Sequence, residues 1–227
     1  MTPNVDPRLR AGPHVFVADV EHPDLDEDDD HHLGRVLRLR AGAELTVSDG
    51  AGRWRPCRFG PVLEPTGDVE LVAAPPPTLT VAAALVKGDR PDWMVQKLTE
   101  IGIDRIVVLH TERSVVRWDG DRAARQLVRL RKVAREAAMQ SRRCWLPAVD
   151  GPWPVAEVAG LPGAAPAEPG GALLTLATPT VLIGPEGGWS PDELSRMAPG
   201  VGIGPSILRT ETAALAAAVL LVAARSQ

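Results

Sequence analysis

The feature that most constrains the fold is an alternation of strand-like and helical segments that begins after Pro75-Pro76-Pro77. Helical stretches, among them PDWMVQKLTEIG, residues 121–143 and an alanine-rich final segment, alternate with the apolar runs LTVAAALVK, RIVVLH, ALLTLA, VLIG and VGIG. This alternation is typical of a parallel sheet with helices on its faces. We therefore predict an α/β domain over residues 75–227, in which 161–172 (LPGAAPAEPGGA) is a flexible loop.

Residues 1–74 have a different pattern. Short strand-like runs (HVFVADV, ELTVSDG, RWRPCRF and DVELVAA) are separated by turn residues such as Asp49-Gly50, and one short helix is expected around residues 31–39. Such a series predicts a small β-barrel over residues 1–74. The three consecutive prolines then form a stiff boundary between two domains.

Length and composition exclude several classes of protein. With 227 residues and a hydrophobic fraction of 44%, the chain can bury a sizeable core. Cys57 and Cys144 lie far apart, so neither a disulfide framework nor a zinc site is expected. His31-His32 follows Asp28-Asp29-Asp30, which favours an acidic helix start over a metal site. The N-terminus lacks the apolar core of a signal peptide, and no apolar run reaches the roughly 20 residues of a membrane span. We expect a cytoplasmic protein without metal or membrane association.

Charge is segregated along the chain. Residues 1–74 hold 8 Lys+Arg against 14 Asp+Glu, a formal charge of −6, whereas residues 105–143 hold 11 against 4, a charge of +7. Most of these cations are arginines, which suit bidentate contacts with phosphate. A solvated amphipathic helix is the alternative, but the further arginines of TERSVVR (111–117) favour a localised phosphate-binding surface.

The stretch VLIGPEGGWSPDEL (181–194) combines an apolar strand, a turn over Gly184–Gly188 and a helix start. SPDE has the form of a capping box with Ser190 as the N-cap. The turn matches neither a P-loop nor a dinucleotide fingerprint. A tight connection accounts for glycines but requires neither Glu186 nor Trp189. Because a turn before a helix N-terminus exposes backbone N–H groups, a ligand site is a second interpretation.

A second turn of this kind lies in GVGIGPSILRTETA (200–213), where Gly204-Pro205 follows a short apolar run. Thr210 is expected to cap the following helix, and Glu211 suits its first turn. Arg209 is a cation at the positive end of that helix, which is unfavourable unless it faces an anion or a developing negative charge. Turns after neighbouring parallel strands meet at the carboxyl edge of the sheet, so we predict a pocket built mainly of backbone.

These segments together resemble the RsmE family of 16S ribosomal RNA uridine-N3 methyltransferases. The resemblance is carried by IGPEGGWS (183–190) and IGPSILRTETA (203–213). Further matches occur in the family's order and cover most of the chain: HHLGRVLRLRAG (31–42), DWMVQKLTEIGI (92–103), TERSVVR (111–117) and EAAMQSRRCWLP (136–147). The family often has glycine at the position of Arg142.

The resemblance implies a fold, a cofactor and an oligomeric state. Residues 75–227 would form a SPOUT methyltransferase domain with a deep trefoil knot, and residues 1–74 a PUA-like β-barrel that helps to hold RNA. The protein would be a cytoplasmic homodimer, with the final helix (212–224) as a candidate for the interface. S-adenosylmethionine would lie in the knot, bound by Leu174, Thr175, Leu176, Ile183, Gly184, Pro185, Glu186, Gly187, Gly188, Ile203, Gly204, Ile207 and Leu208.

The implied reaction is methyl transfer from S-adenosylmethionine to N3 of a uridine in 16S ribosomal RNA of the 30S subunit, a step of rRNA processing in ribosome biogenesis. N3 carries a weakly acidic proton, so a base or an anion-stabilising group is required. Arg209 is the candidate for anion stabilisation, and Glu211 or Glu186 is the candidate base. The candidate RNA contacts are Arg113, Arg117, Arg142 and Arg143.

A non-catalytic RNA-binding or assembly module with the same fold is the alternative. The intact RTET (209–212) beside an intact GPEGG (184–188) favours the enzyme, because a binding module needs only the basic surface.

Overall fold

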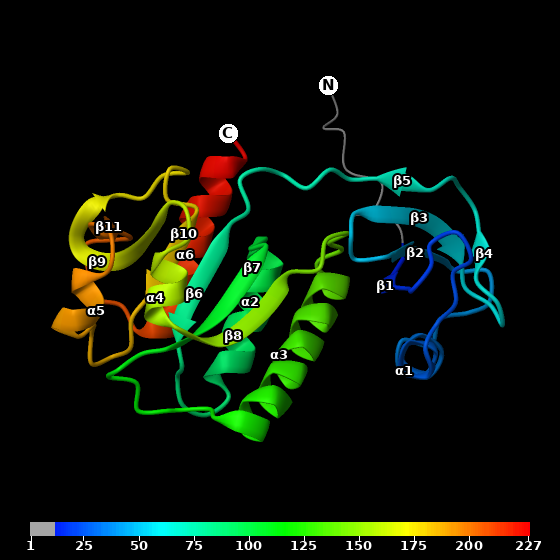
Figure 1. The fold of residues 1–227 in the computed structure, drawn as a ribbon. Helices are drawn as coiled ribbons and strands as arrows, with labels where there is room; N and C mark the ends of the chain where they lie inside the picture. Colours follow the sequence, from blue (N-terminus) through cyan, green and yellow to red (C-terminus); the bar gives the residue numbers. More distant parts are fainter. Residues whose placement is uncertain (1–11) are drawn as a thin grey trace. The chain divides into compact units, whose positions relative to one another are not determined.

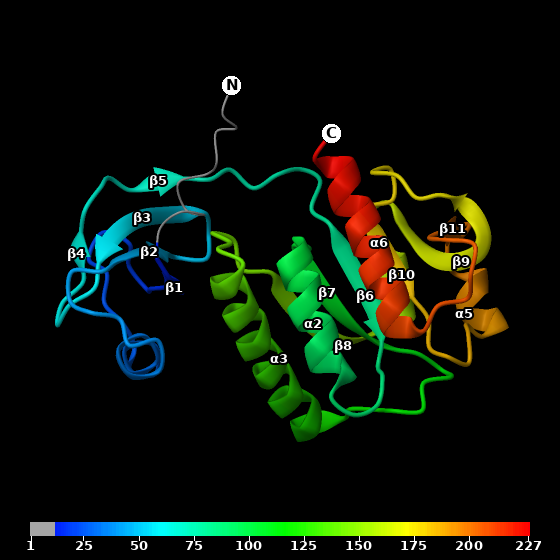
Figure 2. The same ribbon diagram turned by 180° about the vertical axis from the view of Figure 1, so that it is seen from behind.

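A computed structural model describes residues 12–227 (Figures 1 and 2). The chain forms two compact units. The first comprises Met1–Ala74 together with Ala138–Leu146, and the second comprises Pro75–Ala137 together with Pro147–Gln227. The chain therefore passes between the units three times. Among residues 12–227, no helix combines the length and the apolar character that a membrane crossing requires.

The first unit contains a five-stranded sheet in the order β1-β2-β3-β4, with β5 also paired to β3. Its strands are β1 (His14–Phe16), β2 (Glu44–Ser48), β3 (Arg53–Arg58), β4 (Glu64–Pro65) and β5 (Glu70–Leu71). β1 and β2 are parallel and the other pairs are antiparallel. The expected strands are present, while their closure into a barrel stays a prediction. Burial in this unit's core raises the pKa of the Cys57 thiol to about 11, which keeps it protonated and unreactive.

The helix of the first unit begins earlier than the sequence predicted. It comprises α1 (Glu27–His31) and a π-helical turn, η2 (His32–Val36). Asp26 is the N-cap, and its carboxylate accepts a hydrogen bond from the Asp29 amide at 2.7 Å. The aspartate run therefore supplies both the cap and an acidic first turn, which stabilise a helix start. Within residues 12–227, His31 and His32 join no cluster of three potential metal ligands.

Residues 138–146 are held to the first unit by hydrogen bonds. The Trp145 indole Nε1 donates to the Val72 carbonyl at 2.8 Å, and the Gly52 amide donates to the Cys144 carbonyl at 3.0 Å. A side chain at Gly52 would lie 2.6 Å from the Val72 carbonyl oxygen and 2.7 Å from the Trp145 ring. Glycine at position 52 therefore allows the segment to approach closely.

The second unit is built on a six-stranded parallel sheet in the order β11-β9-β10-β6-β7-β8. The predicted α/β class with a parallel sheet is confirmed. The strands are β6 (Thr80–Ala84), β7 (Arg105–His110), β8 (Ala148–Pro154), β9 (Ala164–Leu173), β10 (Thr180–Ile183) and β11 (Val201–Gly202). The helices are α2 (Arg90–Ile101), α3 (Gly120–Gln140), α4 (Val155–Ala159), α5 (Pro191–Ser195) and α6 (Thr210–Arg225).

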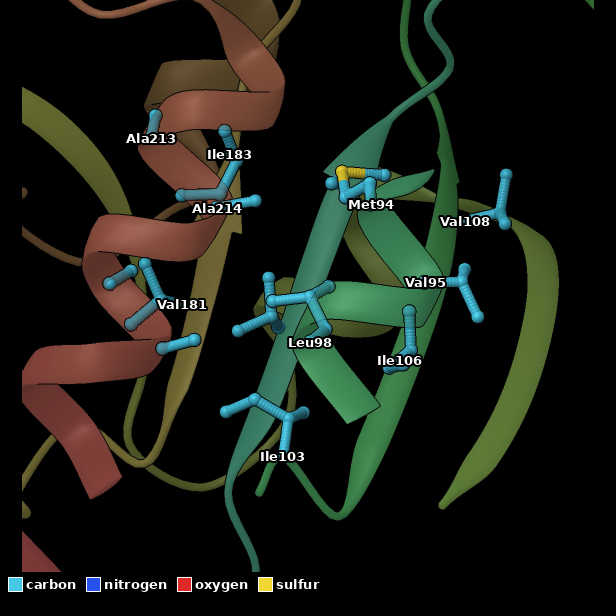
Figure 3. Close-up of a cluster of buried hydrophobic side chains, with 14 of the residues drawn as sticks. Met94, Val95, Leu98, Ile103, Ile106, Val108, Val181, Ile183, Ala213 and Ala214 are labelled. Carbon is cyan, nitrogen blue, oxygen red and sulfur yellow. The ribbon is translucent and has the colours of Figure 1, made fainter. Parts of the chain in front are cut away.

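The central strands are buried on both faces, as parallel strands between helices usually are. Alternate residues, such as Val181 and Ile183 of β10, pack with α2, α3 and α6 on one face (Figure 2), while Leu182 packs with α4 on the other (Figure 1). Figure 3 shows part of the core on the face with α2 and α6, to which these helices contribute Met94, Val95, Leu98, Ala213 and Ala214.

The expectation that residues 161–172 are a flexible loop is wrong. They include most of β9, which pairs with β10 through Ala164–Pro166 and with β11 through Ala172 and Leu173. Residues 167–171 pair with neither strand, and this stretch contains Pro169 and two glycines. Proline and glycine normally argue against a strand interior, but here they lie where one pairing partner is exchanged for the other.

Candidate active site

The predicted turns follow β9, β10 and β11 at the carboxyl edge of the sheet. The sequence analysis expected the strands before the two glycine-containing turns to be neighbours. This expectation is wrong, because β9 lies between β10 and β11. The turns nevertheless touch, since the Thr210 hydroxyl donates to the Gly184 carbonyl at 2.9 Å. The expectation that Thr210 caps α6 is wrong: the helix begins at Thr210, and its N-cap is Arg209.

The glycines of the turn 184–188 are explained by the protein itself. A side chain at Gly184 would lie 3.0 Å from the Trp189 indole, which is buried, and one at Gly187 would lie 3.3 Å from the Arg113 Cβ. Gly188 has φ +68°, a left-handed conformation that favours glycine. The glycine pattern alone is thus no evidence for a ligand.

Two contacts hold the turn 184–188 and the start of α5 to the loop after β7. Arg113 Nη1 donates to the Gly187 carbonyl at 3.1 Å. The predicted capping box of α5 is confirmed, with Ser190 as the N-cap. The Glu193 carboxylate accepts from the Ser190 amide at 2.8 Å and from the Glu112 amide at 2.9 Å. Arg113, expected to contact RNA phosphate, is therefore also a brace of the turn.

Arg90 is a site residue that the sequence analysis missed. It is the first residue of α2, and its Nη1 lies 3.4 Å from Glu186 Oε1 and 3.3 Å from Glu211 Oε1. The structure thus brings both candidate bases to one guanidinium. The sequence did contain an indication, because Arg90 directly precedes Pro91 at the start of a helix. A cation is unfavourable at a helix N-terminus, and the same argument had singled out Arg209 at the start of the last helix.

The two carboxylates differ in their surroundings. The Glu186 side chain is 52% exposed, whereas Glu211 as a whole is only 8% exposed. Within residues 12–227, the buried Oε2 of Glu211 has no hydrogen-bond partner. A buried acceptor without a partner is costly and calls for an explanation, such as a ligand that supplies the missing donor.

Arg209 is exposed at the start of α6, with the extended backbone of an N-cap. Within the described part of the chain, its side chain forms no hydrogen bond or ion pair. Unlike Arg90 and Arg113, it is therefore available to an anion from outside the protein.

Several predicted cofactor-binding side chains belong to the protein's core or close its turns. Leu174, Ile183 and Pro185 are buried, so they can offer a ligand only their backbone groups. The exposed Thr175 closes the turn after β9, where its hydroxyl accepts from the Ala177 amide at 3.3 Å.

Other residues of the turns are open to a ligand. Leu176, Ile203 and Leu208 are partly buried against the core, and Ile207 is 91% exposed. A side chain at Gly204 would meet no protein atom within 4 Å, and its backbone is not left-handed. Neither packing nor conformation therefore requires glycine at position 204, and the backbone there is open to close approach.

The candidate RNA contacts are distributed over both units. Arg113 and Arg117 lie in the second unit, and Arg142 and Arg143 lie in the returning segment of the first. Arg142 has φ +58°, which side chains rarely adopt. This conformation explains why glycine suits the position of Arg142.

A cavity of about 300 Å³ lies at the carboxyl ends of β7 and β8, beside the starts of α4 and α5. Its lining includes Arg117, Arg196 and His110, and none of residues 174–177 or 203–208. The cavity is therefore separate from the turns predicted to bind the cofactor, and no sequence pattern indicated it.

The parallel sheet, with its linked turns at the carboxyl edge, is that of an RNA methyltransferase domain, whose family model matches residues 74–222. An RNA methyltransferase PUA domain model matches residues 25–60. The chain belongs to the ribosomal RNA small subunit methyltransferase E family. It is 36% identical over 226 residues to the protein of that name from Mycobacterium bovis, with 85% of this chain and 83% of the relative covered.

Solved structures agree with this assignment. A methyltransferase from Legionella pneumophila, in complex with S-adenosylmethionine, is 26% identical with a TM-score of 0.79, covering 93% of this chain and 97% of its own. The ribosomal RNA small subunit methyltransferase E of Neisseria gonorrhoeae, bound to S-adenosyl methionine, is 26% identical with a TM-score of 0.74, covering 91% and 94%.

Proposed function

We propose that the protein transfers the methyl group of S-adenosylmethionine to N3 of a uridine in the 16S ribosomal RNA of the small subunit. The observation that carries this proposal is the buried, unpartnered Oε2 of Glu211, two residues from the exposed Arg209 and beside the turn 184–188. The names of the relatives support the ribosomal RNA substrate, and their complexes support the cofactor. A ribosomal substrate implies a cytoplasmic location.

The residues present fit S-adenosylmethionine. Leu176, Ile203 and Leu208 offer an apolar surface that suits an adenine ring, and the open side of Gly204 allows close approach to the backbone. Backbone groups of residues 184–188 and 203–208 complete the proposed site. When bound, the cofactor supplies an electrophilic methyl group on a sulfonium.

The chain's own residues account for the rest of the reaction. Glu211 Oε2 would accept the N3 proton, which leaves an electron pair on N3 for the methyl group that the bound cofactor would supply. Arg209 stabilises the negative charge that develops on the uracil. Holding donor and acceptor in line contributes a large part of the rate. Of the two candidate bases, Glu211 is favoured because Glu186 is half exposed and has no buried free oxygen.

The proposal includes the expected topology, a SPOUT domain with a deep trefoil knot and a PUA-like barrel. The strand order supports the knot, because the chain passes from β9 to β10 and then returns past β9 to form β11. The match of residues 25–60 to a PUA domain supports the barrel.

A homodimer is part of the proposal. One face of α6 carries exposed or half-exposed apolar residues at helical spacing, including Val219 at 52% and Leu220 at 42% exposure. The same helix begins at Thr210 and has Glu211 in its first turn, so an interface along it would lie close to the proposed site. Light scattering tests this: we expect a dimer for the wild type and a monomer for Leu220→Asp.

In the second unit, RNA phosphates would be contacted by Arg113, Arg117 and the exposed arginines of α3, namely Arg122, Arg125 and Arg129. Arg142 and Arg143 are proposed as phosphate contacts of the first unit. Each lost phosphate contact should weaken RNA binding and reduce its dependence on salt.

Methyl transfer from labelled S-adenosylmethionine to 30S subunits tests the proposed function, with the modified nucleotide located by mass spectrometry. We expect 3-methyluridine in the small-subunit RNA with the wild type and its loss with Arg209→Ala. RNA binding without methyl transfer would instead indicate a non-catalytic RNA-binding module.

A further inference from the structure

The side chain of Arg90 is fixed in orientation by the loop that precedes it. Its Nε donates to the Lys87 carbonyl at 3.1 Å. Because the guanidinium is planar and rigid, this bond also fixes the directions of its two terminal nitrogens. One of them, Nη1, lies within 3.4 Å of both candidate carboxylates.

The contact with Arg90 gives the two carboxylate oxygens of Glu211 different surroundings. Oε1 is paired with Arg90 Nη1 at 3.3 Å, and Oε2 is the buried atom without a partner among the described residues. The glutamate side chain is 11% exposed and the arginine side chain 32%. Because Arg90 holds one carboxylate oxygen, it also fixes where the other oxygen lies.

The stability of α2 does not explain why position 90 is an arginine. A cation in the first helical turn opposes the helix dipole, and Pro91 alone would suit this helix start. Glu186 offers a different explanation, because an arginine that paired with this half-exposed carboxylate would only brace the turn 184–188. The two explanations make different predictions for catalysis and for cofactor binding.

We propose that Arg90 is a positioning residue for methyl transfer: it holds the Glu211 carboxylate so that Oε2 is presented to the N3 proton of the target uracil. This inference rests on the function proposed above. Arg90 acts through Glu211 and does not itself touch the reacting atoms.

The first test separates positioning from bracing. Arg90→Ala should lower the kcat for methylation of 30S subunits about tenfold to a hundredfold, because a displaced base loses much of its effect. The Kd for S-adenosylmethionine, measured by calorimetry, should change less than about threefold, and Arg90→Lys should recover part of kcat because it restores the cation. Lys97→Ala is the matched control, since Lys97 forms only a surface pair with Glu100 on the same helix. A weakened Kd with an unchanged kcat would show that Arg90 is only a brace and overturn the inference.

The second test is a double-mutant cycle. If Arg90 acts through Glu211, then Arg90→Ala combined with Glu211→Gln should be no slower than Glu211→Gln alone. Losses that multiply would contradict the proposal. An active wild type with an unaffected Arg90→Ala would overturn only this inference, whereas an inactive wild type would overturn the proposed function as well.

Discussion

The two glycine-containing turns of the second unit have similar sequences, IGPEGG and IGPSIL, but differ in what surrounds them. The turn 184–188 is held by Arg90, Arg113, Thr210 and the buried Trp189. The turn 203–208 has an open Gly204 and an Ile207 that is 91% exposed. The first turn is held by contacts within the protein, whereas the second leaves a glycine and an apolar side chain open. Packing within the protein therefore accounts for Gly184 in the first turn but not for Gly204 in the second.

The largest effect is expected at the carboxylates that Arg90 joins. Glu211→Gln retains the shape of the side chain but cannot accept the proton, so single-turnover methylation of 30S subunits should slow by about 10²–10⁴-fold. Glu186→Gln lies on the braced turn and should slow the reaction by less than about tenfold. An equal or larger loss for Glu186→Gln would assign the base to the first turn and reverse our interpretation.

The glycines themselves give a matched pair of variants. Gly184→Ala places a methyl group 3.0 Å from the Trp189 ring and should reduce the free energy of unfolding by about 1–3 kcal/mol in urea titrations. Gly204→Ala should leave the free energy of unfolding within about 0.5 kcal/mol of wild type. It should instead weaken S-adenosylmethionine binding about tenfold, or about 1.4 kcal/mol. Wild-type cofactor affinity in Gly204→Ala would break the distinction between the turns.

The smallest effect concerns the bond that links the turns. Thr210→Val removes the hydroxyl that donates to the Gly184 carbonyl and should lower the free energy of unfolding by about 1 kcal/mol. Thr66→Val, at an exposed position of the first unit, is the control for the substitution itself. Unfolding free energies that are equal in the two variants would show that this link contributes nothing.

The sequence predicted those parts of the second unit whose signals are local. Continuous apolar runs identified β6, β7 and β10, and the capping box at Ser190 was visible within four residues. β9 was missed because its prolines and glycines oppose a strand by local rules, while its pairing with two separate partners is a property of the whole sheet.

The site was predictable to a similar extent. Arg209, Glu211 and the turn residues were named as candidates from helix-start chemistry and from the family resemblance, and their roles stay predictions. Arg90 was not, because its partners Glu186 and Glu211 are 96 and 121 residues away along the chain. The orphan oxygen of Glu211 also depends on packing that no local pattern encodes.

The return of residues 138–146 to the first unit has a practical consequence for dissecting the protein. A fragment of residues 75–227 would separate Trp145 from the Val72 carbonyl and Cys144 from the Gly52 amide. It would expose a tryptophan and a thiol that the whole chain protects, so we expect such a fragment to aggregate. No single cut in this chain yields two intact domains.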